Sequence, residues 1–470
     1  MVNMYGVKDI KSKTVEYLPL TGAQQWLMGE LLKYKRPGWV CLEFMIKTKQ
    51  PMNEFAMKEA AWYLVARYEN LRVKIYHKDG RWVQELYPLT ESNIYSRYDL
   101  SQETPEEQQV KMREICIKER DWLLPGRGNV IRILYFKFSE KEGRIWFCVH
   151  HVVSDFVSML ILSGDYMNAY NTIVQGRELK RQAVTDYRKW MYILNGYARD
   201  VVFPAQYEYW ISLPWEKAKL LPGDYPDQFG QAEVVNEVLR TKQWLHQYKT
   251  YHLALPQSDT LKLLGRYGLE FEAILIAVFF MAMSNHRKVD CLDIAASHAG
   301  RNLLPAEYEV SEHRLVGYIS LVRVLLLTNP GYGNATRDVH HVAEQIKNIP
   351  HGGTGFAMVI DYIRQDGLRE AYCSLRKNPQ IFFNYLGATN TQGNNEAYEM
   401  VQEDIGQNLY PPEIKDSIFE CSAAINQGQL NITLTYIETY MKESTTAGIL
   451  QLMVGMLRTL VSEQETEKAI

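Results

Sequence analysis

Hydrophobic positions near the N-terminus follow a strand period in some segments and a helix period in others. Apolar and polar residues roughly alternate over 40–48, which predicts a strand, and apolar residues recur at helical spacing over 52–68, which predicts a helix. Ahead of them, Thr21 is expected to cap a helix. Two runs rich in β-branched and aromatic residues flank Asp79 and Gly80, a pair that takes the positive φ of a tight turn, so they are predicted to form a β-hairpin.

Two further runs of the same kind, residues 129–136 and 144–153, predict a second pair of strands. Helical periodicity follows over residues 158–174. His150 and His151 therefore lie where a buried strand ends, shortly before a helix begins. Side chains at such a strand-to-helix turn are often aimed into a cleft.

The periodicity weakens over residues 181–227, where prolines interrupt aromatic-rich stretches. Because a single core stops growing near roughly 250 to 300 residues, a chain of 470 residues is expected to form two lobes. We place the first lobe at residues 1–185 and the second, with the connection, at 186–470, and both predict an α/β (α+β) fold. In the second lobe, strands are predicted over 251–256, 292–300 and 318–327, and helices over 258–267, 271–283 and 338–346.

Composition and charge narrow the range of partners and compartments. Lysine and arginine total 52 against 55 acidic residues, a net charge of -3, which gives no global attraction to nucleic acid or to an anionic membrane. The longest apolar run, residues 273–283, is shorter than the roughly 20 residues of a membrane-spanning helix. The 6 cysteines are scattered, with no CxxC pair of the kind that holds zinc. We therefore expect a cytoplasmic protein with no nucleic-acid partner, no membrane partner and no bound metal.

The segment HHVVSDF, residues 150–156, offers proton-transfer chemistry, because the unperturbed pKa of imidazole is about 6.5. Adjacent side chains on a strand point to opposite faces, so at most one of the two histidines faces a given cleft. Asp155 either contacts the imidazole or holds the turn through a charge-assisted bond to Arg132 on the neighbouring strand, and we favour the second. A purely structural role stays open, since a second pair, His340 and His341, occurs in a predicted helix without an aspartate at the same spacing.

The chain contains no GxSxG elbow, Walker loop or GxGxxG fingerprint, so a functional prediction depends on HHVVSDF and the segments around it. HHVVSDFVS resembles HHxxxDG, the core motif of the condensation domains of nonribosomal peptide synthesis. Other segments resemble blocks of that family in the correct order along nearly the whole chain. They are LTGAQQW at 20–26, ARYENLR at 66–72, NVIRIL at 129–134, AGRN at 299–302, LVGYIS at 315–320 and FFNYLG at 382–387.

The resemblance implies two chloramphenicol-acetyltransferase-like lobes in a V-shape, each a mixed sheet flanked by helices, with a tunnel between them. It also implies that His151 is the catalytic histidine and that His150 is its structural neighbour. Asp155 and Arg132 would form the supporting salt bridge.

In the reaction that the resemblance implies, an amine or hydroxyl acceptor attacks a carrier-bound acyl thioester and forms an amide or an ester. The substrates arrive on the phosphopantetheine arms of carrier proteins, so the chain needs no bound cofactor or metal of its own. No adenylation or carrier segment fits in the remaining length. We therefore expect a free-standing, monomeric enzyme of antibiotic biosynthesis, which meets its carrier proteins in trans and whose acceptor is either carrier-bound or a free small molecule.

Departures from the family pattern keep two alternatives open. Epimerisation domains share this fold and need a second acid-base group, a glutamate, where this chain has Ser297; serine cannot replace a carboxylate base, so the residue argues for condensation. Tyr385 matches a residue linked with epimerase sites, and His298 lies beside Ser297, so these residues are candidates for lining the site. Phe156 replaces the motif's glycine and is expected to narrow or reshape the tunnel. The alternatives are an epimerisation-like enzyme and a catalytically degenerate member that recruits a partner protein.

Overall fold

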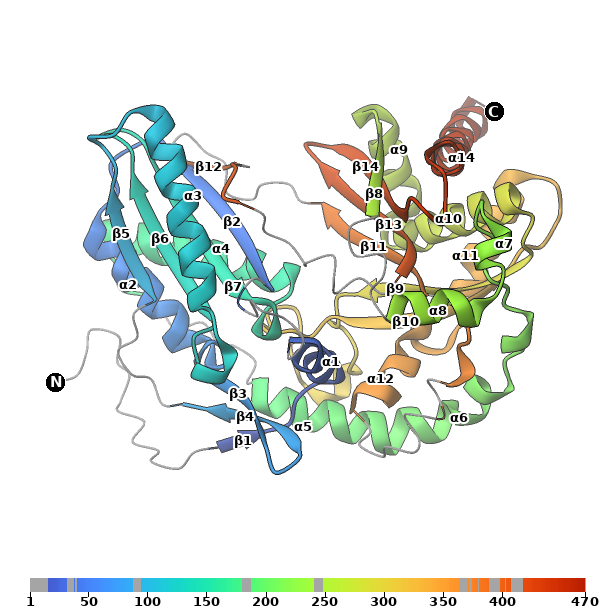
Figure 1. Ribbon diagram of the computed structural model, residues 1–470, viewed down its shortest axis with the longest axis horizontal. Coiled ribbons are helices and arrows are strands. Elements are labelled where there is room, and N and C mark those ends of the chain that lie inside the picture. Colours follow the sequence, from blue (N-terminus) through green and yellow to red (C-terminus); the bar gives the residue numbers. More distant parts are fainter. Residues whose placement is uncertain are drawn as a thin grey trace. The chain divides into compact units, whose positions relative to one another are not determined.

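The computed structural model divides the chain into two compact units (Figure 1). Unit 1 comprises Met1–Asn195, Ala299–Ser320 and Thr391–Pro411. Unit 2 comprises Gly196–His298, Leu321–Asn390 and Pro412–Ile470. These units differ from the predicted contiguous lobes, because two later segments return to unit 1. The structure describes residues 16–31, 38, 40–87, 94–179, 187–240, 248–362, 371, 374–378, 380–388, 398–401, 403–406 and 417–469.

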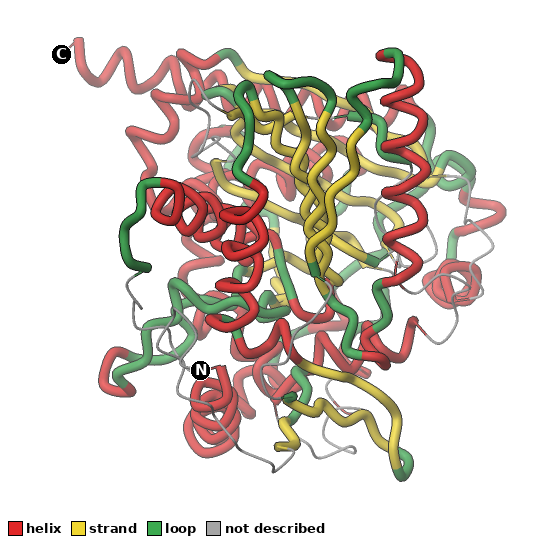
Figure 2. The backbone as a smooth tube through the Cα atoms, turned by 90° about the vertical axis from the view of Figure 1, so that its left-hand side faces the viewer, coloured by secondary structure: helices red, strands yellow, loops and turns green. Residues whose placement is uncertain are grey.

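Unit 1 is built on a five-stranded mixed sheet in the order β12-β2-β7-β6-β5, and Figure 2 shows these strands side by side. β5 runs parallel to β6, and the other pairs are antiparallel. β6 and β7 are buried along almost their whole length, as expected for strands that are covered on both faces. The strands are β2 (Cys41–Thr48), β5 (Tyr95–Asp99), β6 (Ile131–Lys137), β7 (Gly143–His150) and β12 (Tyr398–Val401).

Helices α3 (Pro105–Trp122) and α4 (Phe156–Val174) cover the two faces of this sheet, and α2 (Glu54–Arg67) packs beside α4. Unit 1 also contains α1 (Gly22–Leu31), and α5 (Tyr187–Tyr197) begins in unit 1 and ends in unit 2. Cys116 of α3 shares a core cluster with Trp146, whereas Tyr166 of α4 meets Phe147 edge-on, with ring centroids 4.9 Å apart. Since Trp146 and Phe147 are neighbours on β7, they point to opposite faces. α3 therefore lies on one face of the sheet, and α4 lies on the other with α2 packed against it.

A second, three-stranded sheet of unit 1 contains the predicted hairpin. Its order is β1-β4-β3, with β1 (Glu16–Leu18), β3 (Val73–Lys78) and β4 (Arg81–Leu86). Asp79 and Gly80 have φ of 50° and 79°, the backbone of a type I′ turn, so the hairpin prediction is confirmed.

Unit 2 is built on a six-stranded mixed sheet in the order β10-β9-β11-β13-β14-β8. β11 is parallel to both β9 and β13, and the other pairs are antiparallel. Side chains alternate along β13 between buried, as at Cys421 and Ala423, and partly buried, as at Glu420 and Ser422. The strands are β8 (Tyr248–Leu255), β9 (Cys291–His298), β10 (Leu321–Thr328), β11 (Gln380–Ala388), β13 (Ser417–Asn426) and β14 (Gln429–Ile437).

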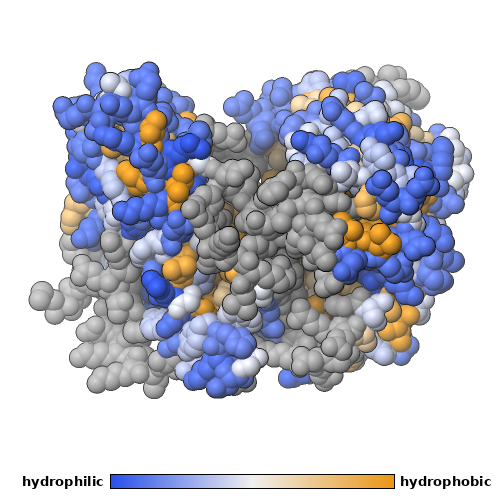
Figure 3. All heavy atoms as spheres, viewed as in Figure 1, coloured by the Kyte–Doolittle hydropathy of each residue, from blue (hydrophilic) through white to orange (hydrophobic). Residues whose placement is uncertain are grey.

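One face of the unit 2 sheet packs against helices, because Phe279 of α10 meets Phe383 and Phe419 at ring-centroid distances of 5.9 and 6.0 Å. The helical span Gln257–Arg287, which runs through α9 and α10, and the part Glu443–Glu463 of α14 are long and apolar enough to cross a membrane by length and composition, but most of their apolar side chains are buried in the core of unit 2. On the face drawn in Figure 3, the described hydrophobic side chains lie in small groups among hydrophilic ones. The helices are α6 (Phe203–Ser212), α7 (Pro226–Phe229), α8 (Ala232–Arg240), α9 (Gln257–Tyr267), α10 (Phe271–Arg287), α11 (Ala335–Asn348), α12 (Thr354–Tyr362) and α14 (Glu443–Ala469).

The predicted α/β (α+β) class, with mixed sheets flanked by helices, is confirmed in both units. Several strand boundaries differ from the prediction by up to three residues. β10, for example, begins at Leu321 rather than Tyr318, because the segment Ala299–Ser320 packs with unit 1.

Candidate active site

HHVVSDF forms a tight turn between β7 and α4 of unit 1. β7 ends at His150, residues His151–Val153 form a single 3-10 turn, and α4 begins at Phe156. His150 is fully buried, and its Nδ1 accepts a hydrogen bond from the Val152 N–H at 3.1 Å. The N–H of His151 donates to the carbonyl of Val40 at 2.9 Å. His150 therefore acts as a cap for the turn, which fits the predicted role of a structural neighbour.

Two amide side chains from distant segments hold the carbonyls that follow His151. Gln24 Nε2 donates to Val152 O at 2.8 Å, and Asn70 Nδ2 donates to Val153 O at 3.0 Å. Both amides are buried, at 1% and 4% exposure. Gln24 lies in the first turn of α1. The predicted cap of this helix is confirmed, since Thr21 Oγ1 accepts a hydrogen bond from Gln24 N. The contacts to the turn were missed, although Gln24 and Asn70 lie in the LTGAQQW and ARYENLR segments.

Asp155 is the polar centre of the turn. Its carboxylate accepts from Ser158 N and Oγ at 2.8 and 2.7 Å, which caps α4. It also forms a two-pronged salt bridge with Arg301, with both N···O distances at 3.0 Å, and accepts from Ser320 N at 3.2 Å. Asp155 and Arg301 are 3% and 6% exposed, so this is a buried charge-assisted pair.

The predicted salt bridge between Asp155 and Arg132 is wrong. Arg132 donates to Glu119 at 2.7 Å and lies over the Trp122 ring, both on α3. It pairs across the sheet with Cys148, and both side chains point to the face that α3 covers. Asp155 instead caps the N-terminus of α4, which covers the opposite face. The missed partner, Arg301, lies in the AGRN segment, 146 residues away along the chain.

The segment Ala299–Ser320 closes over this turn. Ser158 Oγ shares its one proton between Asp155 and Gly317 O, and it accepts from Gly317 N; both Ser158–Gly317 distances are 3.0 Å. Gly300 has φ of 67°, and a Cβ there would lie 1.7 Å from Ile319 O, so the segment can fold back on itself only with glycine at this position. These contacts place Tyr318 on His151, with ring centroids 4.5 Å apart and ring planes at 60°.

The pKa of His151 is affected by its burial beneath the segment Ala299–Ser320. The side chain is 8% exposed, and burial lowers its pKa below the usual 6.5, against an opposing effect of the Asp155 carboxylate. The imidazole is therefore neutral at neutral pH. A neutral imidazole can accept a proton, which is what a general base requires.

Phe156 begins α4 and lies on the side of β2. Its ring meets Phe44 edge-on, with centroids 6.3 Å apart at 86°. The φ of Phe156 is not positive, so the backbone at this position does not require glycine. This position tolerates a side chain because helix α4 has an ordinary first residue there.

The other candidate lining residues belong to unit 2. Ser297 Oγ donates to Asn384 Oδ1, and Ser297 pairs across the sheet with the exposed Val322. His298 points to the opposite face of β9, where burial and the positive charge of Arg323 lower its pKa to about 4. Asn384 was missed, although it lies beside the predicted Tyr385.

Tyr385 packs edge-on against Phe271, with ring centroids 5.9 Å apart. Burial and the charge of Glu272 raise the pKa of its phenol to about 12. Glu272 itself is paired with Arg323 at 2.8 Å. The phenol is therefore un-ionised at neutral pH, as expected of a tyrosine at the edge of a core.

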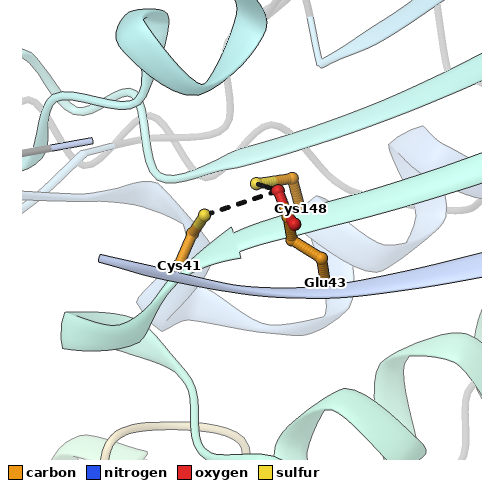
Figure 4. Close-up of side chains that lie close together, drawn as sticks. All are labelled: Cys41, Glu43 and Cys148. Carbon is orange, nitrogen blue, oxygen red and sulfur yellow. Dashed lines mark hydrogen bonds between the residues drawn. The ribbon is translucent and has the colours of Figure 1, made fainter. Parts of the chain in front are cut away.

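Among the described residues, one group has side-chain atoms placed so that they could bind a metal ion: Cys41, Glu43 and Cys148, whose donor atoms lie within 4.8 Å of one another (Figure 4). Both thiols lie near Glu43 Oε1, at 3.6 and 3.4 Å. However, Arg120 binds both carboxylate oxygens of Glu43, at 2.5 and 3.0 Å, with both side chains almost completely buried. Burial also raises the pKa of the Cys148 thiol well above 9.0, which disfavours the thiolate that a metal needs. The chemistry favours a buried ion pair.

Comparison with known proteins identifies a family model and relatives that match this chain. The Condensation domain family model matches residues 15–469. A linear gramicidin synthase of Brevibacillus parabrevis is 25% identical over 452 residues, which is 95% of this chain but 8% of that protein. Bacitracin synthase 2 of Bacillus licheniformis is 22% identical over 481 residues, 99% of this chain and 18% of that protein. The chain thus spans a small part of these relatives.

Solved structures with the same fold include both epimerization and condensation domains. The epimerization domain from the third module of tyrocidine synthetase B matches with a TM-score of 0.79 and 19% identity, covering 96% of this chain and 97% of that one. The first condensation domain of the calcium-dependent antibiotic synthetase, in complex with a substrate analogue, has a TM-score of 0.66 and 14% identity, covering 95% and 96%. The condensation domain from Monacolin K polyketide synthase has a TM-score of 0.70 and 10% identity, covering 96% and 98%. These likenesses establish the fold that was expected from the sequence.

Proposed function

The chain belongs to the condensation-domain family, and from that premise we propose that it joins a carrier-bound acyl thioester to an amine or hydroxyl acceptor, with His151 as the catalytic residue. One observation supports this most directly. His151 is held in a turn fixed by buried hydrogen bonds, and burial lowers its pKa, so it is a neutral imidazole at neutral pH. Such a group is suited to take a proton from an attacking nucleophile.

In the proposed reaction, the N–H or O–H of the acceptor donates a hydrogen bond to His151. The lone pair of the acceptor attacks the thioester carbonyl while the imidazole takes the proton. The tetrahedral intermediate then collapses, the carbon–sulfur bond breaks, and the proton returns to the leaving thiolate. An amide or an ester and a free carrier thiol result.

In this proposal Asp155 is a positioning residue. Its carboxylate joins the N-terminus of α4, the guanidinium of Arg301 and the backbone of Ser320. Through these contacts it fixes the turn on one side of His151 and the covering segment on the other.

Epimerisation is the second candidate, favoured by the TM-score of 0.79 to an epimerization domain. An epimerase must remove and return a proton on opposite faces of one carbon, which calls for a second acid-base group. Ser297, at the position of the glutamate of that branch, donates its hydroxyl proton to Asn384 and cannot serve as a base at neutral pH. We therefore rank condensation first.

We also propose that the acyl donor, and in some cases the acceptor, is presented on the phosphopantetheine of a carrier protein that is a separate chain. The proposal includes a monomeric, cytoplasmic enzyme that binds no cofactor of its own and acts in antibiotic-type biosynthesis. The acceptor is either carrier-bound or a free small molecule. A catalytically degenerate member that recruits a partner protein is the outcome to expect if no acyl transfer is found.

The test combines separately purified, aminoacyl-loaded carrier protein with the chain and a panel of amines and alcohols, in light and in heavy water. Condensation predicts a product whose mass is the sum of the two substrates minus the carrier thiol, without deuterium at the α-carbon. Deuterium incorporation and an inverted α-carbon, without a joined product, would support epimerisation instead. Binding of carrier protein with neither outcome would support the recruiting role.

A further inference from the structure

The segment Ala299–Ser320 is anchored on both sides of one aromatic residue. Before Tyr318, Arg301 donates to Leu315 O at 2.7 Å, and Gly317 exchanges two hydrogen bonds with the Ser158 hydroxyl. After Tyr318, Ser320 N donates to Asp155. The backbone on both sides of Tyr318 is therefore held against HHVVSDF by the Asp155 carboxylate and the Ser158 hydroxyl, the two groups that lie at the N-terminus of α4.

Close packing adds to these bonds. A Cβ at Gly317 would lie 2.9 Å from the Tyr187 ring and 3.1 Å from the Ile319 side chain, so the backbone before Tyr318 sits tightly against its neighbours. Val316 and Ile319 are buried, at 2% and 1% exposure, whereas Tyr318 is half-buried. The segment thus buries its aliphatic side chains and presents the Tyr318 ring at its surface.

The ring lies on His151. The two centroids are 4.5 Å apart, which is within contact distance for aromatic rings, and the 60° tilt brings the edge of one ring towards the face of the other. Such a contact restricts rotation of the imidazole about its χ2 bond. It also removes water from one side of the imidazole.

Resting on the proposed function, we infer that Tyr318 is a positioning residue for His151: its ring, whose flanking backbone is held by Asp155 and Ser158, fixes the plane of the imidazole and shields it from water. The ring rather than the hydroxyl carries this role. Position 318 therefore requires an aromatic side chain. The turn that carries His151 is complete only with Tyr318, which lies far from it in sequence.

Electrostatics support the geometry. Burial is the main cause of the lowered pKa of His151, and Asp155 is the ionised group that opposes it, with Arg301 paired to that carboxylate. Removing the Tyr318 ring admits water to the imidazole. The pKa of His151 then rises towards 6.5, and the acid limb of the pH–rate profile moves to higher pH.

The experiment compares Tyr318→Leu with Tyr318→Phe in the full chain. The matched control is Tyr332→Leu, which removes an aromatic contact from another histidine, His341, at a centroid distance of 5.4 Å. Histidine side-chain NMR follows the titration of His151, whose signal is assigned by its loss in His151→Gln. We expect Tyr318→Leu to raise the His151 pKa and to lower kcat about 10- to 100-fold with a smaller change in KM, whereas Tyr318→Phe and Tyr332→Leu stay near wild type.

The two readouts separate this inference from the proposed function. A Tyr318→Leu variant with an unchanged His151 titration overturns the inference, whatever the chain catalyses. An equal loss in Tyr318→Phe also overturns it, because the hydroxyl would then carry the effect. If the wild type gives no joined product while the titration shifts as expected, the proposed function fails and the positioning role stands.

Discussion

The chain contains the same dipeptide in two places, and the structure treats the two histidine pairs very differently. His150 and His151 end a central strand and enter a turn whose carbonyls, carboxylate and covering segment are all bonded. His340 and His341 lie within helix α11, where each contacts a tyrosine hydroxyl, Tyr267 at 3.0 Å and Tyr332 at 3.4 Å. The residue type is identical, so the difference lies in the backbone and its distant partners.

The comparison teaches what makes a histidine useful for proton transfer. Both pairs have aromatic neighbours, so an aromatic contact alone does not define a site. What distinguishes His151 is burial together with a turn held by segments from across unit 1. Each of the following measurements tests one part of that difference.

The largest effect is expected from exchanging the histidines themselves. His151→Gln removes the proposed base and is predicted to lower kcat about 100- to 10,000-fold, because general base catalysis typically contributes that much. His341→Gln, on the exposed side of α11, is predicted to leave kcat unchanged. Steady-state rates of product release from a loaded carrier provide the measurement, and similar losses in both variants would remove the distinction between the pairs.

The next effect concerns the salt bridge that holds the turn. Asp155→Asn leaves the buried Arg301 without its counter-ion and is predicted to lower the free energy of unfolding by about 3 to 5 kcal/mol. Urea unfolding of the single and double variants measures the coupling between the two side chains. We expect strong coupling between Asp155 and Arg301 and almost none between Asp155 and Arg132. The reverse pattern would restore the salt bridge predicted from the sequence.

One partly buried histidine, His298, also predicts a pH dependence of stability. The pKa of His298 is about 4 in the folded chain against about 6.5 when unfolded, so between these values the unfolded state binds the additional proton. Stability is therefore lost as the pH falls from about 6.5 to about 4. His298→Gln is predicted to flatten this part of the curve of unfolding free energy against pH, and the exposed His341→Gln is not. A curve that is equally steep in His298→Gln and in wild type would contradict the assignment.

The smallest effect is expected from the amides behind the turn. Gln24→Ala removes the donor to Val152 O and leaves that buried carbonyl unpaired, at a predicted loss of about 1 to 3 kcal/mol in the free energy of unfolding. Gln25→Ala is the matched control, because its amide donates only a longer bond of 3.3 Å to Leu20 O. Thermal unfolding compares the two, and equal losses would show that Gln24 has no special role.

The same division between local and distant information explains what the sequence could predict. The Asp79–Gly80 hairpin, the β6–β7 pair and the helix after HHVVSDF follow from local hydrophobic periods and turn residues. These features need no knowledge of the rest of the chain.

The partner of Asp155 required more than local information. Arg132 lies on the adjacent strand, so the sequence predicts it as the partner, but strand alternation turns its side chain towards α3. Arg301 reaches Asp155 only because a segment from far along the chain returns to unit 1. The strand β12, which pairs with β2 in the same sheet, was missed for the same reason.

The most direct test of the central claim is the mass of the donor carrier protein after a single turnover with acceptor. We predict that, with the wild-type chain, the carrier returns to its free-thiol mass while the acceptor gains the acyl group. With His151→Gln, the carrier should keep its acyl group over the same time. Equal rates of acyl loss in the two chains, each leading to the same joined product, would contradict the role that we assign to His151.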